Sequence, residues 1–205
     1  MAQIKTRRGE LVQDPSFVQK LFGDTRFGLL WLLPRLWLGY QWIDAASHKI
    51  TSSAWMVTGD ALKGYWANAV AVPASGHPAV AFDWYRGFLQ GMLDAQAYTW
   101  FAKLVAIGEL AVGIALILGA FTGIAAFAAG FMNWNYMMAG SASTNPLLFV
   151  VSVGLILAWK VSGYIGVDFF LLRWLGTPWH GAPVDSKDET KQRIGSTVPG
   201  MASGK

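Results

Sequence analysis

The sequence predicts an all-α membrane protein: four transmembrane helices in a bundle, with amphipathic helices in a long extracytoplasmic loop. Hydrophobic residues make up 54% of the 205 residues and charged residues only 14%, against about 25% charged in an average soluble domain. Eleven tryptophans are present, and tryptophan favours membrane interfaces. Three long apolar runs crowd into residues 101–165. They leave little polar face, which disfavours the alternative of buried helices in a soluble all-α protein.

Each of the four apolar runs has about the length that crosses roughly 30 Å of hydrocarbon at about 1.5 Å per residue. The first run is the shortest and holds Pro34 and Arg35 at its middle. A polar arm, residues 1–26, precedes it, and no A-x-A-like cleavage site follows it, so we expect a retained first helix. The predicted spans are 27–43, 101–121, 123–140 and 147–165.

The segment between the first two spans, residues 44–100, is too long for an unstructured loop in a compact protein. It contains two aromatic-rich stretches with helical character, 52–69 and 80–98, divided by the breaker 73–78. We expect both stretches to lie on the membrane surface and to cap the bundle.

Orientation follows from the lysines and arginines. The N-terminal arm carries five of them, whereas the much longer loop 44–100 carries three. The positive-inside rule therefore places both termini in the cytoplasm of a multi-pass plasma-membrane protein, with the loop outside. The tail, residues 171–205, is expected to be cytoplasmic and disordered from about residue 181.

Small residues recur at every fourth position of the second span, at Ala111, Ala115, Gly119 and Gly123. Such a stripe lets helix backbones approach closely in lipid. The turn that follows this span is very short, which predicts that the second and third spans form an antiparallel hairpin.

Several classes of site are disfavoured by what the sequence holds. The absence of cysteine excludes disulfides, iron–sulfur clusters and covalently attached haem. The histidines, at 48, 77 and 180, have no spacing that would ligate haem or another metal within the bundle. The basic residues form no stripe, and no nucleotide-binding glycine motif or hydrolase triad is present. We therefore expect no metal, no haem and no nucleic-acid partner.

Two charges fall inside the predicted spans. Arg35 lies eight residues from the outer end of the first span, and Glu109 lies eight residues from the outer end of the second. Both depths are about 12 Å. A lone charge at the centre of a bilayer costs roughly 2.5–3.5 kcal/mol on insertion scales. Equal depth and opposite sign predict an ion pair between Arg35 and Glu109.

Other polar side chains are predicted near the same level, which indicates a polar pocket in the outer half of the bundle. Asn133 and Asn135 lie close to this depth, and Tyr40 and Tyr136 lie slightly further out. Two interpretations remain open. The charged pair is a structural pin that fixes helix register, or the pocket binds a quinone headgroup or another small polar ligand, with an acid that passes protons during reduction.

Four stretches and one charged position form a combined pattern that covers most of residues 27–170. They are Arg35 with Gly39, Gly108–Leu110 followed by Gly113–Gly119, Asn133–Gly140, Gly140–Leu147, and Ala158–Lys160 followed by Gly163–Asp168. This pattern resembles the DoxX/DoxD family of small membrane proteins. The outer loop, with 61–65 and 85–89, is more similar to the DoxD branch than to shorter members.

The resemblance implies a four-helix membrane protein. In the DoxD branch it implies the membrane subunit of a thiosulfate:quinone oxidoreductase, which works with a second, smaller subunit and yields tetrathionate. On this hypothesis Glu109 and Arg35 are catalytic, and quinone is the substrate-like cofactor. The quinone-binding residues would be Asn133, Asn135, Tyr40 and Tyr136, and the residues that attract the anionic donor would be Lys63, Arg86 and Lys103.

A hypothesis of another class stays open beside it. The chain would then be a non-catalytic structural or assembly subunit of a larger respiratory or photosynthetic membrane complex. A transporter is disfavoured, because no inverted repeat or pair of broken helices is visible beyond Pro34.

Overall fold

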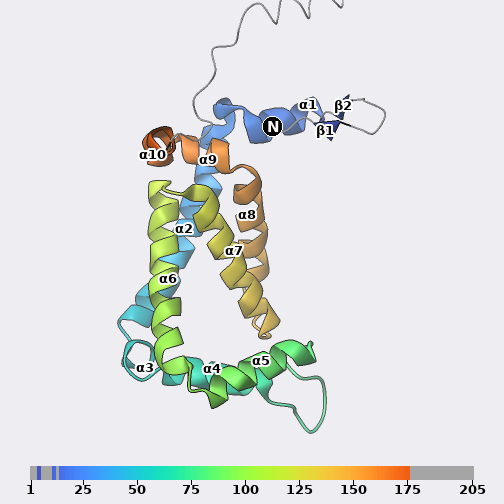
Figure 1. Cartoon of the computed structure of the whole chain (residues 1–205), viewed down its shortest axis with the longest axis vertical. Helices are drawn as coiled ribbons and strands as arrows, with labels where there is room; N and C mark the ends of the chain where they lie inside the picture. The colour runs from blue at the N-terminus through green and yellow to red at the C-terminus, as the bar shows by residue number, and fades with distance from the viewer. Residues whose placement is uncertain (1–3, 6–10, 13, 176–205) are drawn as a thin grey trace, which may run out of the picture. The chain divides into compact units, whose positions relative to one another are not determined.

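The described part of the chain folds almost entirely into α-helices, which confirms the all-α fold class (Figure 1). The computed structural model describes residues 4–5, 11–12 and 14–175. Two short strands, β1 (Ile4–Lys5) and β2 (Leu11–Val12), pair antiparallel near the N-terminus. The helices are α1 (Ser16–Gly23), the 3-10 turn η1 (Thr25–Phe27), α2 (Gly28–Ile50), α3 (Ser53–Met56), α4 (Asp60–Val70), α5 (Asp83–Asp94), α6 (Tyr98–Leu118), α7 (Thr122–Met138), α8 (Asn145–Leu157), α9 (Trp159–Tyr164) and α10 (Asp168–Trp174).

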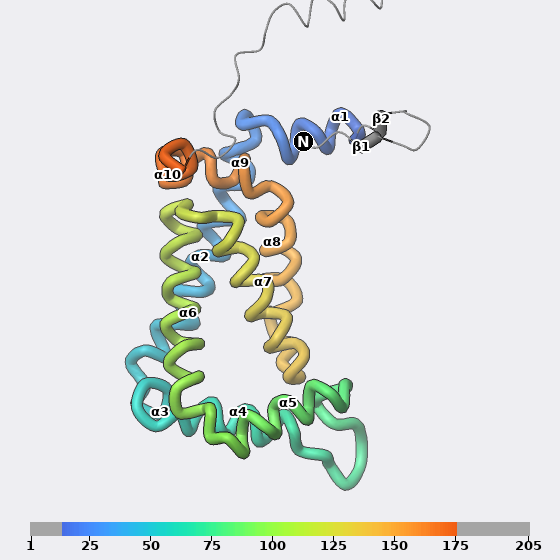
Figure 2. Tube along the Cα trace, in the orientation of Figure 1, coloured from blue at the N-terminus to red at the C-terminus, as the bar shows by residue number. Residues whose placement is uncertain are grey.

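Four long helices, α2, α6, α7 and α8, run lengthwise and form a bundle (Figures 1 and 2). Helices α3, α4 and α5 lie across one end, which we call the loop end. Helices α1 and α9 lie at the opposite end, which we call the terminal end. Residues 170–205 form a separate unit, of which the structure describes 170–175. The tail predicted to be disordered from about residue 181 lies outside the described residues.

Two groups of buried side chains hold this arrangement together. One fills the centre of the bundle, with Leu38, Leu116 and Leu155 fully buried. The other attaches the loop end, where Trp66 and Leu89 pack with Ala102 of α6. The aromatic-rich loop is therefore a packed part of the fold, and its helices cap the bundle as predicted.

The predicted spans and the observed helices differ in their bounds. Helix α2 continues to Ile50, whereas the first predicted span ends at 43. Its polar continuation, residues 44–50, keeps helical geometry because it contains no Gly or Pro and buries Ala46 against the bundle. The fourth predicted span is divided at Ala158 into α8 and α9.

Helices α2 and α6 approach each other almost backbone to backbone. A methyl group added at Gly39 would lie 3.0 Å from the carbonyl oxygen of Gly113. The predicted small-residue stripe is thus only partly right: Gly113 makes the contact with α2, whereas Ala111 is exposed. Gly119 follows the end of α6 in the left-handed region, at φ +66°. It therefore belongs to the short turn of the predicted hairpin.

Replacing Gly113 with Ala is expected to force α2 and α6 apart. The new methyl group would lie 2.7 Å from Ile43 Cγ1 and 2.9 Å from the backbone nitrogen of Ile43, which cannot move aside as a side chain can. Overpacking of this kind costs typically about 1–3 kcal/mol. Thermal melting of the purified protein should show the loss. Gly108→Ala is the matched control on the same helix, because nothing lies within 4 Å of its added methyl group; equal melting temperatures of the two variants would contradict the packing argument.

The surface of the bundle is strongly apolar. In the described part of the chain one helix, α6, is long and apolar enough to cross a bilayer, and α8 is apolar but shorter. All four bundle helices expose large apolar side chains. The exposed set includes Leu29, Leu30, Leu33, Leu104, Ile107, Ile114, Leu118, Ile124, Phe127, Phe131, Leu147, Val150, Val153 and Leu157.

Candidate functional site

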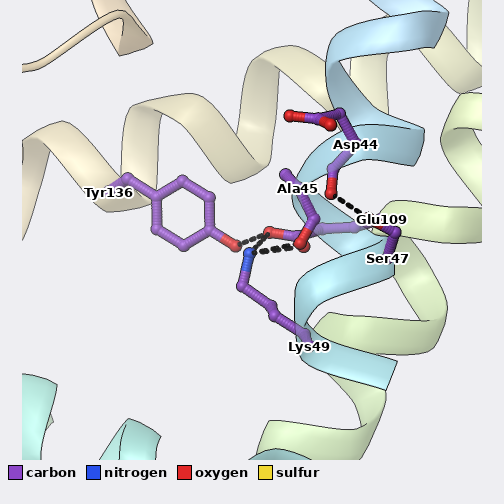
Figure 3. A network of polar contacts seen from close by, with 6 residues as sticks. All are labelled: Asp44, Ala45, Ser47, Lys49, Glu109 and Tyr136. Carbon is purple, nitrogen blue, oxygen red and sulfur yellow. Dashed lines mark hydrogen bonds and ion pairs between the residues drawn. The ribbon is translucent and has the colours of Figure 1, made fainter. Parts of the chain in front are cut away.

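Three polar side chains from three bundle helices converge near the loop end (Figure 3). The ammonium of Lys49, in the last turn of α2, lies 2.6 Å from Oε2 and 2.9 Å from Oε1 of Glu109 on α6. The hydroxyl of Tyr136, near the end of α7, donates to Oε1 of Glu109 at 2.5 Å. The Glu109 side chain is 1% exposed and that of Lys49 is 20% exposed. We call these residues the Lys49–Glu109–Tyr136 network.

The network satisfies a carboxylate that would otherwise be costly to bury. The Lys49 ammonium also lies over the ring of Trp55 in α3, 5.2 Å from the ring centre, which is a cation–π distance. Glu109 thus has a hydrogen-bond donor on each side, Lys49 and Tyr136.

The network lies on the wall of a cavity of about 390 Å³, which we call the polar cavity. Pockets of this size hold small organic ligands. Its lining comes from α2, α3, α4, α6, α7, α8 and the turn before α8, and comprises Gln41, Trp42, Asp44, Ala45, Lys49, Trp55, Leu62, Tyr65, Glu109, Asn133, Tyr136, Ser141, Thr144, Asn145 and Leu148.

Two of the lining residues carry polar atoms without a partner. Asn133 is fully buried, and neither its amide nitrogen nor its amide oxygen has a hydrogen-bond partner within the described chain. The indole nitrogen of Trp42 is in the same state. An unsatisfied buried polar group costs about 1–3 kcal/mol. Both residues line the polar cavity, and their unpartnered atoms are buried in its wall.

Beside it lies a second cavity of about 340 Å³, which we call the apolar cavity. It is bounded by α4, α5, α6 and α7. Its lining comprises Leu62, Tyr65, Trp66, Tyr85, Phe88, Leu89, Met92, Phe101, Val105, Phe131, Met132, Asn135, Tyr136 and Ala139.

The predicted ion pair between Arg35 and Glu109 is wrong. Arg35 donates instead to the carbonyl oxygens of Ser162 and, at 2.8 Å, of Ile165, near the terminal end. Gly39 faces Gly113 where α2 and α6 cross. Arg35 lies four residues before Gly39, and Glu109 lies four residues before Gly113. Because α2 and α6 are antiparallel, these two steps lead toward opposite ends of the bundle. Arg35 and Glu109 are thereby separated by about 12 Å along the bundle.

Arg35 and Asp168 are buried together at the terminal end, and we call this pair, with the backbone groups that it contacts, the terminal cluster. The carboxylate of Asp168 interacts electrostatically with Arg35. It also accepts hydrogen bonds from the backbone nitrogens of Phe121, at 2.5 Å, and Thr122, at 2.8 Å. Asp168 therefore caps the first turn of α7, where a negative charge is stabilising.

The same segment satisfies the end of α6. The backbone nitrogens of Val167 and Asp168 donate to the carbonyl oxygens of Leu118 and Gly119. A methyl group at Gly119 would lie 2.6 Å from Nη1 of Arg35, so glycine is required there for space as well as for its backbone angle. The terminal cluster is structural: its charges face backbone groups and each other.

The remaining predicted ligand-binding residues divide between the cavities and the surface. Asn133 and Tyr136 line the polar cavity, as expected. Asn135 lines the apolar cavity, where its side chain donates to the carbonyl oxygen of Phe131 and accepts from the hydroxyl of Tyr85. Tyr40 is 62% exposed and is not among the lining residues of either cavity.

The three residues predicted to attract an anion do not gather at a cavity. Lys63 lies over the ring of Tyr98 at 5.3 Å, and Arg86 forms a surface ion pair with Asp83. Neither they nor Lys103 are among the residues lining the two cavities. That these three side chains attract an anion stays a prediction.

Lys49 was missed from the sequence because it lies beyond the apolar run. A signal was present: Trp42, Ala46 and Lys49 recur at helical spacing. A helix continued through the polar stretch would have placed Lys49 on the same face as Trp42, toward α6.

Burial also affects the loop-end tyrosines. Desolvation raises the pKa of Tyr85 to about 12, with a smaller contribution from Tyr65. A tyrosine in the unfolded chain has a pKa of about 10. Between about pH 10 and 12 the unfolded state therefore loses a proton that the native state keeps. Stability is unaffected by this group below pH 10 and falls as pH rises through that window.

With Tyr85→Phe, the stability of the protein is accordingly expected to fall less steeply as pH rises between about 10 and 12. The measurement is the melting temperature of both proteins across about pH 9 to 12, compared as a difference so that other titrating groups cancel. Curves that stay parallel through the window would show that the Tyr85 hydroxyl is not held neutral by the fold.

No family model, no curated protein and no solved structure matches this chain. Among the described residues, no group of three or more His, Asp or Glu side chains is placed to hold a metal ion.

Proposed function

We propose that the chain is the membrane subunit of a quinone-linked oxidoreductase, similar to DoxD, that passes electrons from thiosulfate to quinone. The observation that carries the proposal is the Lys49–Glu109–Tyr136 network on the wall of the polar cavity, beside the unpartnered amide of Asn133. A quinone headgroup needs hydrogen-bond donors for its carbonyl oxygens and a source of protons when it is reduced. The polar cavity offers both.

A membrane location is part of the proposal. The large apolar side chains that α2, α6, α7 and α8 expose find a suitable environment in lipid. Helix α6 has the length and composition of a span, and α2 is 23 residues long, about 35 Å. On this proposal the four bundle helices cross the plasma membrane, the terminal end is cytoplasmic and the loop end is outside.

The proposed reaction balances as a two-electron transfer. Two thiosulfate ions lose one electron each and join through a new S–S bond as tetrathionate. The quinone takes the two electrons and two protons and becomes the quinol. In this reaction Lys49 and Tyr136, which both donate to Glu109, are the proton-bearing groups at the wall of the cavity, and the Asn133 amide is the proposed donor to a quinone carbonyl oxygen. A second subunit would carry electrons from the donor.

The test is thiosulfate-dependent reduction of a quinone by the protein purified from membranes, alone and with the partner that co-purifies with it. We expect turnover that depends on both thiosulfate and quinone. If neither the chain nor its native complex reduces quinone, the proposal fails.

The exposed aromatic residues of the loop end favour one second candidate. Phe82, Trp84 and Phe88 are more than half exposed, a composition suited to docking a partner. The chain would then be a non-catalytic structural or assembly subunit, and stoichiometric co-purification without quinone turnover would support this role.

A further inference from the structure

The polar and apolar cavities share a boundary. Leu62 and Tyr65 of α4 and Tyr136 of α7 line both of them. Tyr136 presents its hydroxyl to Glu109, and the hydroxyl of Tyr65 donates to the carbonyl oxygen of Tyr136. Leu62 and this pair of tyrosines thus lie where a compartment with charged and amide groups meets one lined almost wholly by carbon.

The apolar cavity reaches the apolar exterior. Phe88 of α5 and Phe131 of α7 line it and are 52% and 54% exposed. Phe131 also stacks on Phe127, which is 62% exposed. A flexible apolar chain inside this cavity would therefore continue past these rings into hydrocarbon, without meeting water.

We propose that one amphipathic ligand occupies both compartments, its polar ring in the polar cavity and its apolar tail in the apolar cavity. This rests on the proposed function and specifies its substrate class: a prenylated, membrane-borne quinone. The two compartments match the two halves of such a molecule. The ring meets the Asn133 amide and the Lys49–Glu109–Tyr136 network, and the tail meets Leu89, Met92 and Val105.

The experiment measures equilibrium binding, so that it does not depend on turnover. The protein in lipid nanodiscs is titrated with two quinones that share a headgroup, one with a farnesyl tail and one with a methyl group in its place. Val105→Trp fills the apolar cavity from α6. We expect it to weaken binding of the farnesyl quinone about tenfold, the effect of denying burial to roughly two methylene groups, and to leave the methyl quinone unchanged.

The matched control is Leu104→Trp, which places the same side chain one residue earlier, at an exposed position that lines neither cavity. It should bind both quinones as the native protein does. Met92→Trp fills the same cavity from α5 and replaces Val105→Trp if that variant does not fold. It should show the same selective loss.

The outcomes separate the two proposals. If the protein binds both quinones and neither cavity-filling variant changes that binding, the tail site is overturned and the headgroup site stands. Binding of neither quinone by the native protein would overturn the proposed function and the tail site with it. A photoreactive group at the end of the farnesyl tail should label the peptides that contain Leu89, Met92 or Val105; labelling elsewhere would overturn the tail site on its own.

Discussion

Replacing Glu109 with Gln is expected to lower quinone reduction at least about a hundredfold while the protein still folds. Glutamine keeps the size of the side chain and still accepts a hydrogen bond from Tyr136, but it removes the negative charge that holds the Lys49 proton beside the cavity. Lys49 is the proton-bearing group that Glu109 positions, and loss of a positioned acid–base group costs typically about 10²–10⁴ in rate. Lys49 is 20% exposed and remains reachable by water, so we expect a small effect on stability. The measurements are turnover and thermal melting of the same preparation.

Asp94→Asn is the control for loss of a carboxylate charge. Asp94 accepts a hydrogen bond from Gln90 on exposed α5 and lines neither cavity, so full turnover is expected. If Glu109→Gln turned over at the native rate, the Glu109 carboxylate would have no role in the reaction. Failure of that variant to fold, with turnover unchanged per folded molecule, would favour the structural or assembly role.

Replacing Arg35 with Leu should cause the largest loss of stability of any single substitution proposed here. The guanidinium is 2% exposed and bridges two backbone carbonyls at the end of α9 beside the carboxylate of Asp168. Removing one partner of a buried charge pair costs about 3–5 kcal/mol, because the other charge is left uncompensated. Arg35→Lys should recover part of the loss, since an ammonium keeps the charge but not the planar fork.

Arg86→Met is the matched comparison. Arg86 pairs with Asp83 on the surface of α5, where an ion pair contributes about 0–1 kcal/mol. Denaturant-induced unfolding should therefore give Arg35→Leu a much lower free energy of unfolding than Arg35→Lys. The free energy of unfolding of Arg86→Met should be close to that of the native protein. The folded fraction of Arg35→Lys should turn over normally, because Arg35 lies about 12 Å from the level of Glu109. A selective loss of turnover in it would reinstate a catalytic role for Arg35.

The sequence was informative about side chains that lie within apolar runs. Glu109 and Asn133 were predicted near one depth, with Tyr136 slightly further out, and all three line the polar cavity. Their helices enter the bundle close to the predicted residues, so their depths were counted from nearly correct ends. Asn135 and Tyr40, from the same predicted pocket, do not line it.

The ion pair was mispredicted because hydropathy measures where a chain is apolar, not where a helix ends. The stretch 44–50 is polar, yet it continues α2 to Ile50. Counting from residue 43 placed Arg35 too near the loop end and left Lys49 outside the helix altogether. The interaction of Arg35 with Asp168 could not be inferred either. Asp168 is held in place by the backbone of Thr122, 46 residues earlier in the chain, and the sequence gives no sign of that contact.

The contacts of Asp168 also set an order of assembly. When α6 and α7 have been synthesised, the first turn of α7 still has its amide groups uncapped, and the last carbonyls of α6 lack the donors of Val167 and Asp168. Both deficits are removed together by one short segment made later. Nascent chains that stop short of residue 167 should therefore leave the hairpin open to proteolysis at its turn, and chains that extend past residue 168 should close it.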